Sequence, residues 1–243
     1  MCKKTYNANM KNYLNGVTFR LDFFSLPDFK AYYVPLIKAD FPDSSFQERV
    51  LTDDESQIVN VDTLSYSLDL PLNDILKERV YVFDKIVKGG ISYNIFVSPH
   101  YICIHADINN ANFPDEPGDD INEILGNFFS KIDLQKVFCM TSHFFSAKSE
   151  DEVWTVLDKE AYPKLILDDS YEGGNFIESI SSSYSWIDLK RSVMKSDVDD
   201  GSTSFDFVVL TSAESKRIDK KDMKGLYNHL YEDSIAEVAK CFK

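Results

Sequence analysis

Cysteine, histidine, glycine and proline are all scarce in this sequence, with 4 Cys, 4 His, 9 Gly and 8 Pro in 243 residues. So little glycine and proline argues against a loop-rich or low-complexity chain. The cysteines form no Cys-x-x-Cys pair and suggest no disulfide framework. No run approaches the roughly 18 apolar residues of a membrane-spanning helix, and the first residues lack the apolar core of a signal peptide. We therefore predict a cytoplasmic protein.

Basic residues are also in deficit, because 26 Lys and Arg face 40 Asp and Glu, a formal net charge of −14. Non-specific binding to nucleic acid needs clustered Lys and Arg, and anionic membranes repel an acidic chain. An acidic surface instead speeds the encounter with a basic protein. We predict a protein partner, for which a basic protein is the natural candidate, with no direct nucleic acid and no membrane contact. The oligomeric state stays open.

Several motifs that carry chemistry are missing. The chain has no Gly-x-Ser-x-Gly nucleophile elbow and no P-loop, so Gly89-Gly90 and Gly173-Gly174 are better explained as turns. The paired carboxylates, such as Asp199-Asp200, do not follow calcium-loop spacing. We accordingly predict no cofactor and no metal.

What the sequence does contain is alternation of apolar and polar residues over much of its length. Period-two patterns predict half-buried strands. The alternating segments are 17–24, 91–98 and 101–108. Further strands are predicted over 80–87, 137–145 and 204–210, with a long extended stretch over 176–193. Between them, 53–55 resembles a turn and 58–70 an irregular strand.

Helical periodicity appears in three places. A first helix is expected over 28–40, short or kinked because Pro35 interrupts it. Stronger apolar stripes at 3.6-residue spacing predict helices over 121–132 and 222–242. The order of elements is not a strict strand-helix alternation, so we predict an α+β fold with antiparallel sheets and helices packed on one face. The polar run at 146–151 divides the chain into 1–148 and 149–243, either two similar halves or one continuous domain.

The histidines supply one candidate catalytic site. His105 and Asp107 share a strand face, whereas His100 belongs to the opposite face. If strands 101–108 and 137–145 pair, Cys139 and His143 could join His105 and Asp107 in a hydrolase site. The alternative is a sheet surface with satisfied polar groups.

The final helix offers a second candidate surface, for partner binding. Its faces other than the apolar stripe carry polar and aromatic side chains. These residues are Tyr227, His229, Tyr231, Glu232 and Asp233.

Three segments resemble the landmarks of a sporadically distributed bacterial family of about this length and of unknown function. They are 17–24 (VTFRLDFF), 139–145 (CMTSHFF) and 226–235 (LYNHLYEDSI), with Phe242 at the end. The family's Arg-Tyr-x-Asn motif is absent from the central segment. The resemblance implies a bacterial protein, an accessory to a mobile or defence-related locus, and implies no activity.

Two functions follow from these patterns. The first is a non-enzymatic binding or accessory factor, of immunity or defence type, that uses an acidic, aromatic-rich surface. The alternative is the hydrolase built from His105, Asp107, Cys139 and His143.

Overall fold

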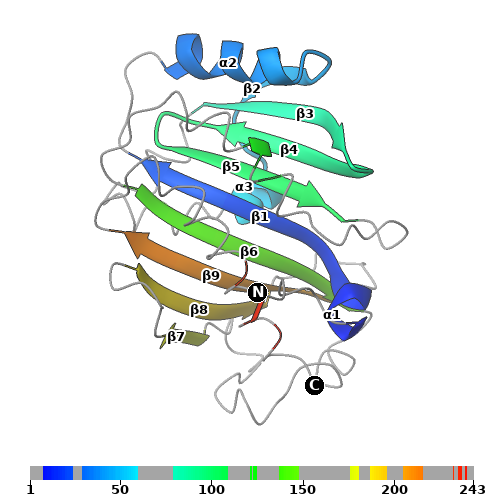
Figure 1. The fold of residues 1–243 in the computed structure, drawn as a ribbon, viewed down its shortest axis with the longest axis vertical. Coiled ribbons are helices and arrows are strands. Elements are labelled where there is room, and N and C mark those ends of the chain that lie inside the picture. Colours follow the sequence, from blue (N-terminus) through cyan, green and yellow to red (C-terminus); the bar gives the residue numbers. More distant parts are fainter. Residues whose placement is uncertain are drawn as a thin grey trace.

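The described part of the chain forms nine strands in one antiparallel sheet, with the order β2-β3-β4-β5-β1-β6-β9-β8-β7 (Figure 1). A computed structural model describes residues 8–23, 29–59, 79–108, 121, 123–124, 137–147, 176–180, 187–195, 205–215, 232, 235–236 and 239. The antiparallel sheet confirms the predicted class of sheet.

The strand bounds follow the predicted segments closely. The strands are β1 Leu14–Phe23, β2 Ser45–Arg49, β3 Val80–Lys88, β4 Ile91–Val97, β5 Tyr101–Asp107, β6 Val137–Ala147, β7 Phe176–Ile180, β8 Ile187–Lys195 and β9 Phe205–Ser215. Two corrections apply. The short edge strand β2 was not predicted, and the single stretch over 176–193 is two strands that pair with each other.

The β3–β4 connection is the tight turn expected at Gly89-Gly90. Both glycines have positive φ, 60° and 86°. Two successive positive φ values are what a two-residue hairpin of type I′ needs, and glycine adopts them without a steric penalty. This turn fixes the register in which Lys88 faces Ile91.

Three helices are described: α1 Ala8–Tyr13, α2 Phe29–Asp40 and α3 Asp53–Val59. Helix α2 confirms the prediction over 28–40 and includes Pro35. Helix α3 corrects the predicted turn at 53–55 and the beginning of the predicted strand over 58–70. The remainder of that strand lies outside the described residues.

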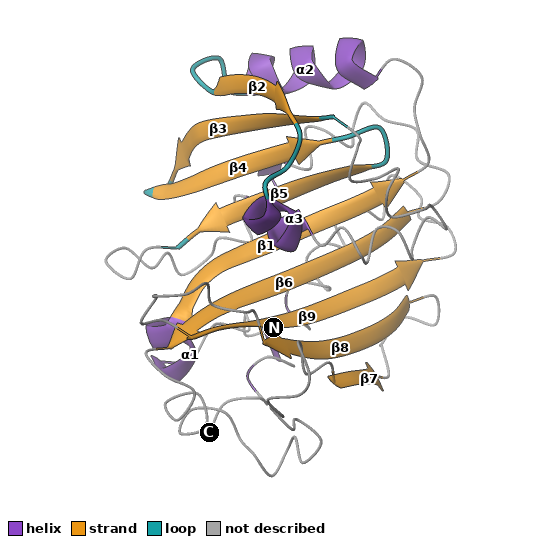
Figure 2. Ribbon diagram, turned by 180° about the vertical axis from the view of Figure 1, so that it is seen from behind, coloured by secondary structure: helices purple, strands orange, loops and turns teal. Residues whose placement is uncertain are grey.

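The helices occupy different places around the sheet. Helix α2 lies beyond the β2 edge, α1 lies at one end of β1, and α3 lies over the face turned toward the viewer in Figure 2. In the two helices predicted at 121–132 and 222–242, the described residues are helical, and Ile121, Ile124 and Ile235 are buried. Most of both segments lies outside the described residues, so helices packed on one face stay a prediction. None of the described helices has the length and apolar character to cross a membrane.

The centre of the sheet is buried on both faces, which corrects the expectation of half-buried strands there. In β5, six consecutive residues from Tyr101 to Ala106 are buried. In β1, Val17, Phe19 and Leu21 form one buried face, and Thr18, Arg20 and Asp22 are just as buried on the other. The polar face of this strand therefore belongs to the interior.

The sheet also runs across the predicted boundary at 148–149. Strand β6 from the first half pairs with β9 from the second over ten positions, from Phe138↔Glu214 to Ala147↔Phe205. One sheet therefore contains strands from both halves. Whether each half is a domain of its own stays a prediction.

Candidate functional site

The polar face of β1 is the candidate site, because it gathers charged and hydroxyl side chains in the middle of the sheet. Strand β1 lies between β5 and β6, and Thr18 is opposite His105 on one side and Ser142 on the other. In the next strand, β4, Asn94 is opposite His105. Since residues opposite each other in an antiparallel pair share a face, Asn94, His105, Thr18 and Ser142 form one polar row across four strands.

Hydrogen bonds join part of this row into a continuous chain. The Oγ1 of Thr18 lies 2.8 Å from Nδ1 of His105, and Nε2 of His105 lies 3.0 Å from Oδ1 of Asp107. The amide Nδ2 of Asn94 donates to the other oxygen of Asp107 at 3.2 Å. This series of hydrogen bonds runs from the buried hydroxyl of Thr18 to the carboxylate of Asp107, whose side chain is 45% exposed.

Both nitrogens of His105 are used in this arrangement. A neutral imidazole can donate to Asp107 and accept from Thr18, and a protonated one can donate to both oxygens. The ring therefore has hydrogen-bond partners in either protonation state. Its edge also meets the ring of Phe144 at 88°, with centroids 5.5 Å apart.

Gly16 makes room for the imidazole. A Cβ at this position would lie 2.7 Å from Cε1 of His105 and 3.3 Å from its Nε2. Real Cβ atoms do not come as close as 2.7 Å to another heavy atom. The place of the ring thus depends on the absence of a side chain on β1.

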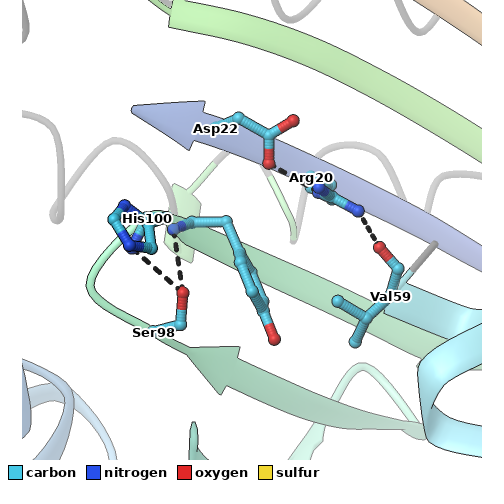
Figure 3. A network of polar contacts seen from close by, with 6 residues as sticks. Arg20, Asp22, Val59, Ser98 and His100 are labelled. Atoms are coloured by element: carbon cyan, nitrogen blue, oxygen red, sulfur yellow. Dashed lines mark hydrogen bonds and ion pairs between the residues drawn. The ribbon is translucent and has the colours of Figure 1, made fainter. Parts of the chain in front are cut away.

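A second polar group, Arg20 with Asp22, lies further along the same face (Figure 3). The Nε of Arg20 donates to Oδ1 of Asp22 at 2.6 Å, and both side chains are fully buried. Nη1 of Arg20 donates to the carbonyl oxygen of Val59, the last residue of α3. The guanidinium also lies over the ring of Tyr101, 5.1 Å from its centroid.

These contacts place a cation at the C-terminal end of a helix, where the carbonyl groups carry partial negative charge. Val59 and Tyr101 belong to one apolar cluster with Val80, Val82, Phe96 and Cys103. Arg20 therefore joins α3 to the sheet inside an apolar environment.

Burial has a strong effect on the ionisable groups nearby. It raises the pKa of Asp22, although the charge and hydrogen bond of Arg20 act to lower it. Burial also raises the pKa of the Cys103 thiol to about 12. A thiol with such a pKa carries almost no thiolate at neutral pH, so Cys103 is a poor nucleophile.

His100 belongs to the turn between β4 and β5. Its backbone N–H and that of Tyr101 donate to Oγ of Ser98, at 3.0 and 3.1 Å (Figure 3). Burial lowers the pKa of the His100 imidazole. These hydrogen bonds to the Ser98 hydroxyl explain the backbone conformation of the turn. His100 is not a member of the polar row that contains His105.

The residues of the predicted hydrolase site do not meet in one place. Strand β1 separates β5 from β6, so these two strands do not pair as the prediction required. His105 and Asp107 lie on the face of Thr18, whereas His143 is opposite Val17 and lies on the other face. By alternation Cys139 shares the face of His143, and its side chain lies outside the described residues.

His143 itself is completely buried on this other face. Burial lowers the pKa of its imidazole to about 3, so the ring is neutral at ordinary pH. Within the described residues, no group of three or more His, Cys, Asp or Glu side chains could hold a metal ion.

The predicted partner-binding residues can be placed only in part. Glu232 is helical and half-buried. Tyr227, His229, Tyr231 and Asp233 lie outside the described residues.

Sequence reasoning missed Thr18, Arg20, Asp22 and Asn94 as members of the site. The available signal was that Arg20 and Asp22 alternate with apolar residues in a strand flanked by other strongly apolar strands. A central strand is covered on both faces, so its polar side chains need internal partners.

Comparison of the chain with protein-family models, with curated proteins and with solved structures gave no match. The resemblance to a bacterial family accordingly stays a prediction.

Proposed function

We propose that this protein is a non-enzymatic accessory factor that binds a basic protein partner through its acidic, aromatic-rich surface. Immunity or defence association, which the family resemblance implies, is part of the same proposal. The arrangement of the polar side chains is the observation on which the proposal rests.

At the sheet centre, Thr18 and His105 share a hydrogen bond, and Arg20 and Asp22 form an internal ion pair. Thr18, Arg20, Asp22 and His143 are fully buried, and Cys103 is held as a thiol. Groups of this kind make a rigid scaffold and give a substrate little access. The chain meanwhile keeps a net charge of −14, which favours encounter with a positively charged surface.

Co-purification tests this proposal. The tagged chain is expressed in its native organism and purified at about 0.1 M and about 1 M salt, where the Debye lengths are roughly 10 and 3 Å. We expect a basic protein to co-purify in stoichiometric amount at the lower salt concentration and to be lost at the higher one. An unrelated acidic protein of similar size and charge, carrying the same tag, is the control.

Recovery of the chain only as a lone monomer at the lower salt concentration would count against the proposal. So would recovery of the same basic proteins with the acidic control, because that result shows attraction between charges without recognition.

One geometric feature favours an enzyme as the second candidate. Thr18, His105 and Asp107 connect a hydroxyl, an imidazole and a carboxylate, the order of groups in hydrolases that use a hydroxyl nucleophile. This hydrolase ranks second because the hydroxyl of Thr18 is fully buried. The ring also presents Nδ1 to the hydroxyl, the reverse of the usual orientation.

Hydrolysis of a small activated ester distinguishes the two candidates. The hydrolase requires the Thr18→Val variant, which keeps the shape and loses the hydroxyl, to lose the activity of the wild-type chain. Equal rates of hydrolysis for the wild type and Thr18→Val would exclude the hydrolase.

A further inference from the structure

Asp107 differs from the other carboxylates of the described ion pairs, because its partners include no Lys or Arg. Asp22, Glu55 and Glu48 pair with Arg20, Arg49 and Arg79, and Glu123 pairs with Lys88. Asp107 instead contacts His105 and Asn94 within the described residues. Among the described residues, no permanently charged neighbour therefore balances its negative charge.

The two contacts also hold the carboxylate in a fixed orientation. His105 contacts Oδ1, Asn94 contacts Oδ2, and both partners project from strands in the middle of the sheet. His105 is in turn held by its hydrogen bond with Thr18, and it fits because Gly16 has no side chain. A carboxylate fixed in this way loses little conformational entropy when it binds a further group.

Each oxygen of Asp107 still has capacity to accept. An ionised carboxylate offers about four acceptor positions, and the two internal contacts use two of them. A planar guanidinium can donate two parallel hydrogen bonds to the remaining positions, whereas an ammonium acts as a point charge. With 45% of its side chain exposed, Asp107 is accessible to such a group.

We infer that Asp107 is the anchor carboxylate of the partner-binding surface and receives an arginine side chain of the basic partner. The inference rests on the proposed function and adds to it a recognition residue. Asn94 and His105 act as positioning residues for the anchor. Charge complementarity between this chain and an arginine-bearing surface is the reason for choosing this occupant.

The probe is a fluorescent Arg-rich peptide of about eight residues, compared with its Lys counterpart. Binding to the full chain is followed by anisotropy. We expect the wild-type chain to prefer the arginine peptide, and Asp107→Asn to weaken that peptide's binding roughly tenfold and remove the preference.

Asp43→Asn is the matched control, because Asp43 is exposed and the substitution removes the same charge. It should change the affinity less than about twofold, as expected for a surface charge without a defined geometry. Equal losses for Asp43→Asn and Asp107→Asn would overturn the inference, since only net charge would then matter.

Asn94→Ala gives an independent measurement, because it keeps the charge of Asp107 and removes one of its supports. A several-fold loss of arginine-peptide affinity supports the inference, and unchanged affinity and preference overturn it. If circular dichroism shows that Asp107→Asn is misfolded, the Asn94→Ala variant alone tests whether Asp107 is the anchor.

Failure of the anchor can be told apart from failure of the proposed function. If the basic partner co-purifies equally with wild type and Asp107→Asn, the function stands and the anchor is wrong. If the wild-type chain co-purifies with no basic protein, the proposed function fails whatever the peptides do.

Discussion

Arg20 and Asp22 are the residues at which burial and charge conflict most directly. Both side chains are removed from water, and Arg20 replaces its hydration with Asp22, the Val59 carbonyl and the Tyr101 ring. Removing one partner of a buried pair leaves the other charge uncompensated, whereas an apolar pair of similar size is often tolerated.

Arg20→Met should therefore lower the free energy of unfolding by about 3–5 kcal/mol, and Arg20→Met combined with Asp22→Leu should recover much of that loss. Urea denaturation of the wild type, both single variants and the double variant forms the thermodynamic cycle. Additive losses in the double variant would show that the two side chains do not depend on each other.

Gly16 provides a steric test of the place of His105. Gly16→Ala should destabilise the protein by about 1–3 kcal/mol, because the new methyl group overlaps Cε1 of a ring held on both nitrogens. In the His105→Ala background the overlap disappears, and Gly16→Ala should cost little or nothing. A loss of the same size in both backgrounds, measured by thermal unfolding, would mean that Gly16 is needed for a different reason.

At the scale of elements, α3 shows why a segment that resembles a turn became a helix. The N–H of Glu55 donates to Oγ1 of Thr52 at 3.3 Å, and the N–H of Thr52 donates to a carboxylate oxygen of Glu55 at 2.9 Å. This reciprocal pair is a capping box, and Thr-x-x-Glu is its sequence signal. The run of Asp53, Asp54 and Glu55 also suits the first turn of a helix, where negative charge is favourable.

Thr52→Ala should therefore cost about 1 kcal/mol of folding stability, and Thr52→Ser should cost much less, because serine keeps the capping oxygen. Chemical denaturation of the three proteins measures the difference. Thr52 is exposed, so lost packing is a small term. Equal stability of the alanine variant and the wild type would show that tertiary packing alone holds α3.

The elements themselves were predictable to different degrees. Strands β1, β4 and β5 follow clear alternation, whereas β3 begins with four consecutive apolar or aromatic residues. The Gly89-Gly90 turn follows from glycine's tolerance of positive φ. The five residues of β2 are too few for a periodic signal. They form a strand because β3 offers a partner, with the ring of Phe46 stacked on that of Tyr81 and tilted against that of Phe83.

At the scale of the whole molecule, His143 links folding to pH. Burial lowers the pKa of its imidazole from 6.5 to about 3, so between these values the unfolded chain binds a proton that the folded chain does not. Stability therefore falls as the pH decreases through this range, by at most about 1.4 kcal/mol per pH unit from this one group.

His143→Leu should remove that dependence. The difference in unfolding free energy between wild type and variant should change in favour of the variant as the pH falls from about 6.5 to about 3. Carboxylates titrate in both proteins and cancel in the comparison. Parallel stability curves over this range would show that His143 becomes protonated in the folded state.

The sequence by itself determined the period of the strands, the two faces of β1 and the placement of His105 and Asp107 on one face, because these are local consequences of alternation. Only the tertiary structure decided that β1 lies between β5 and β6. That order brings Thr18 to His105 across 87 positions and separates His105 from His143. It also decided that the polar face of β1 is buried, because covering both sides of a sheet depends on segments far away in the chain. Local sequence patterns do not determine which strands become neighbours in the sheet. In this protein the site is formed by residues on neighbouring strands, so the strand order decides its composition.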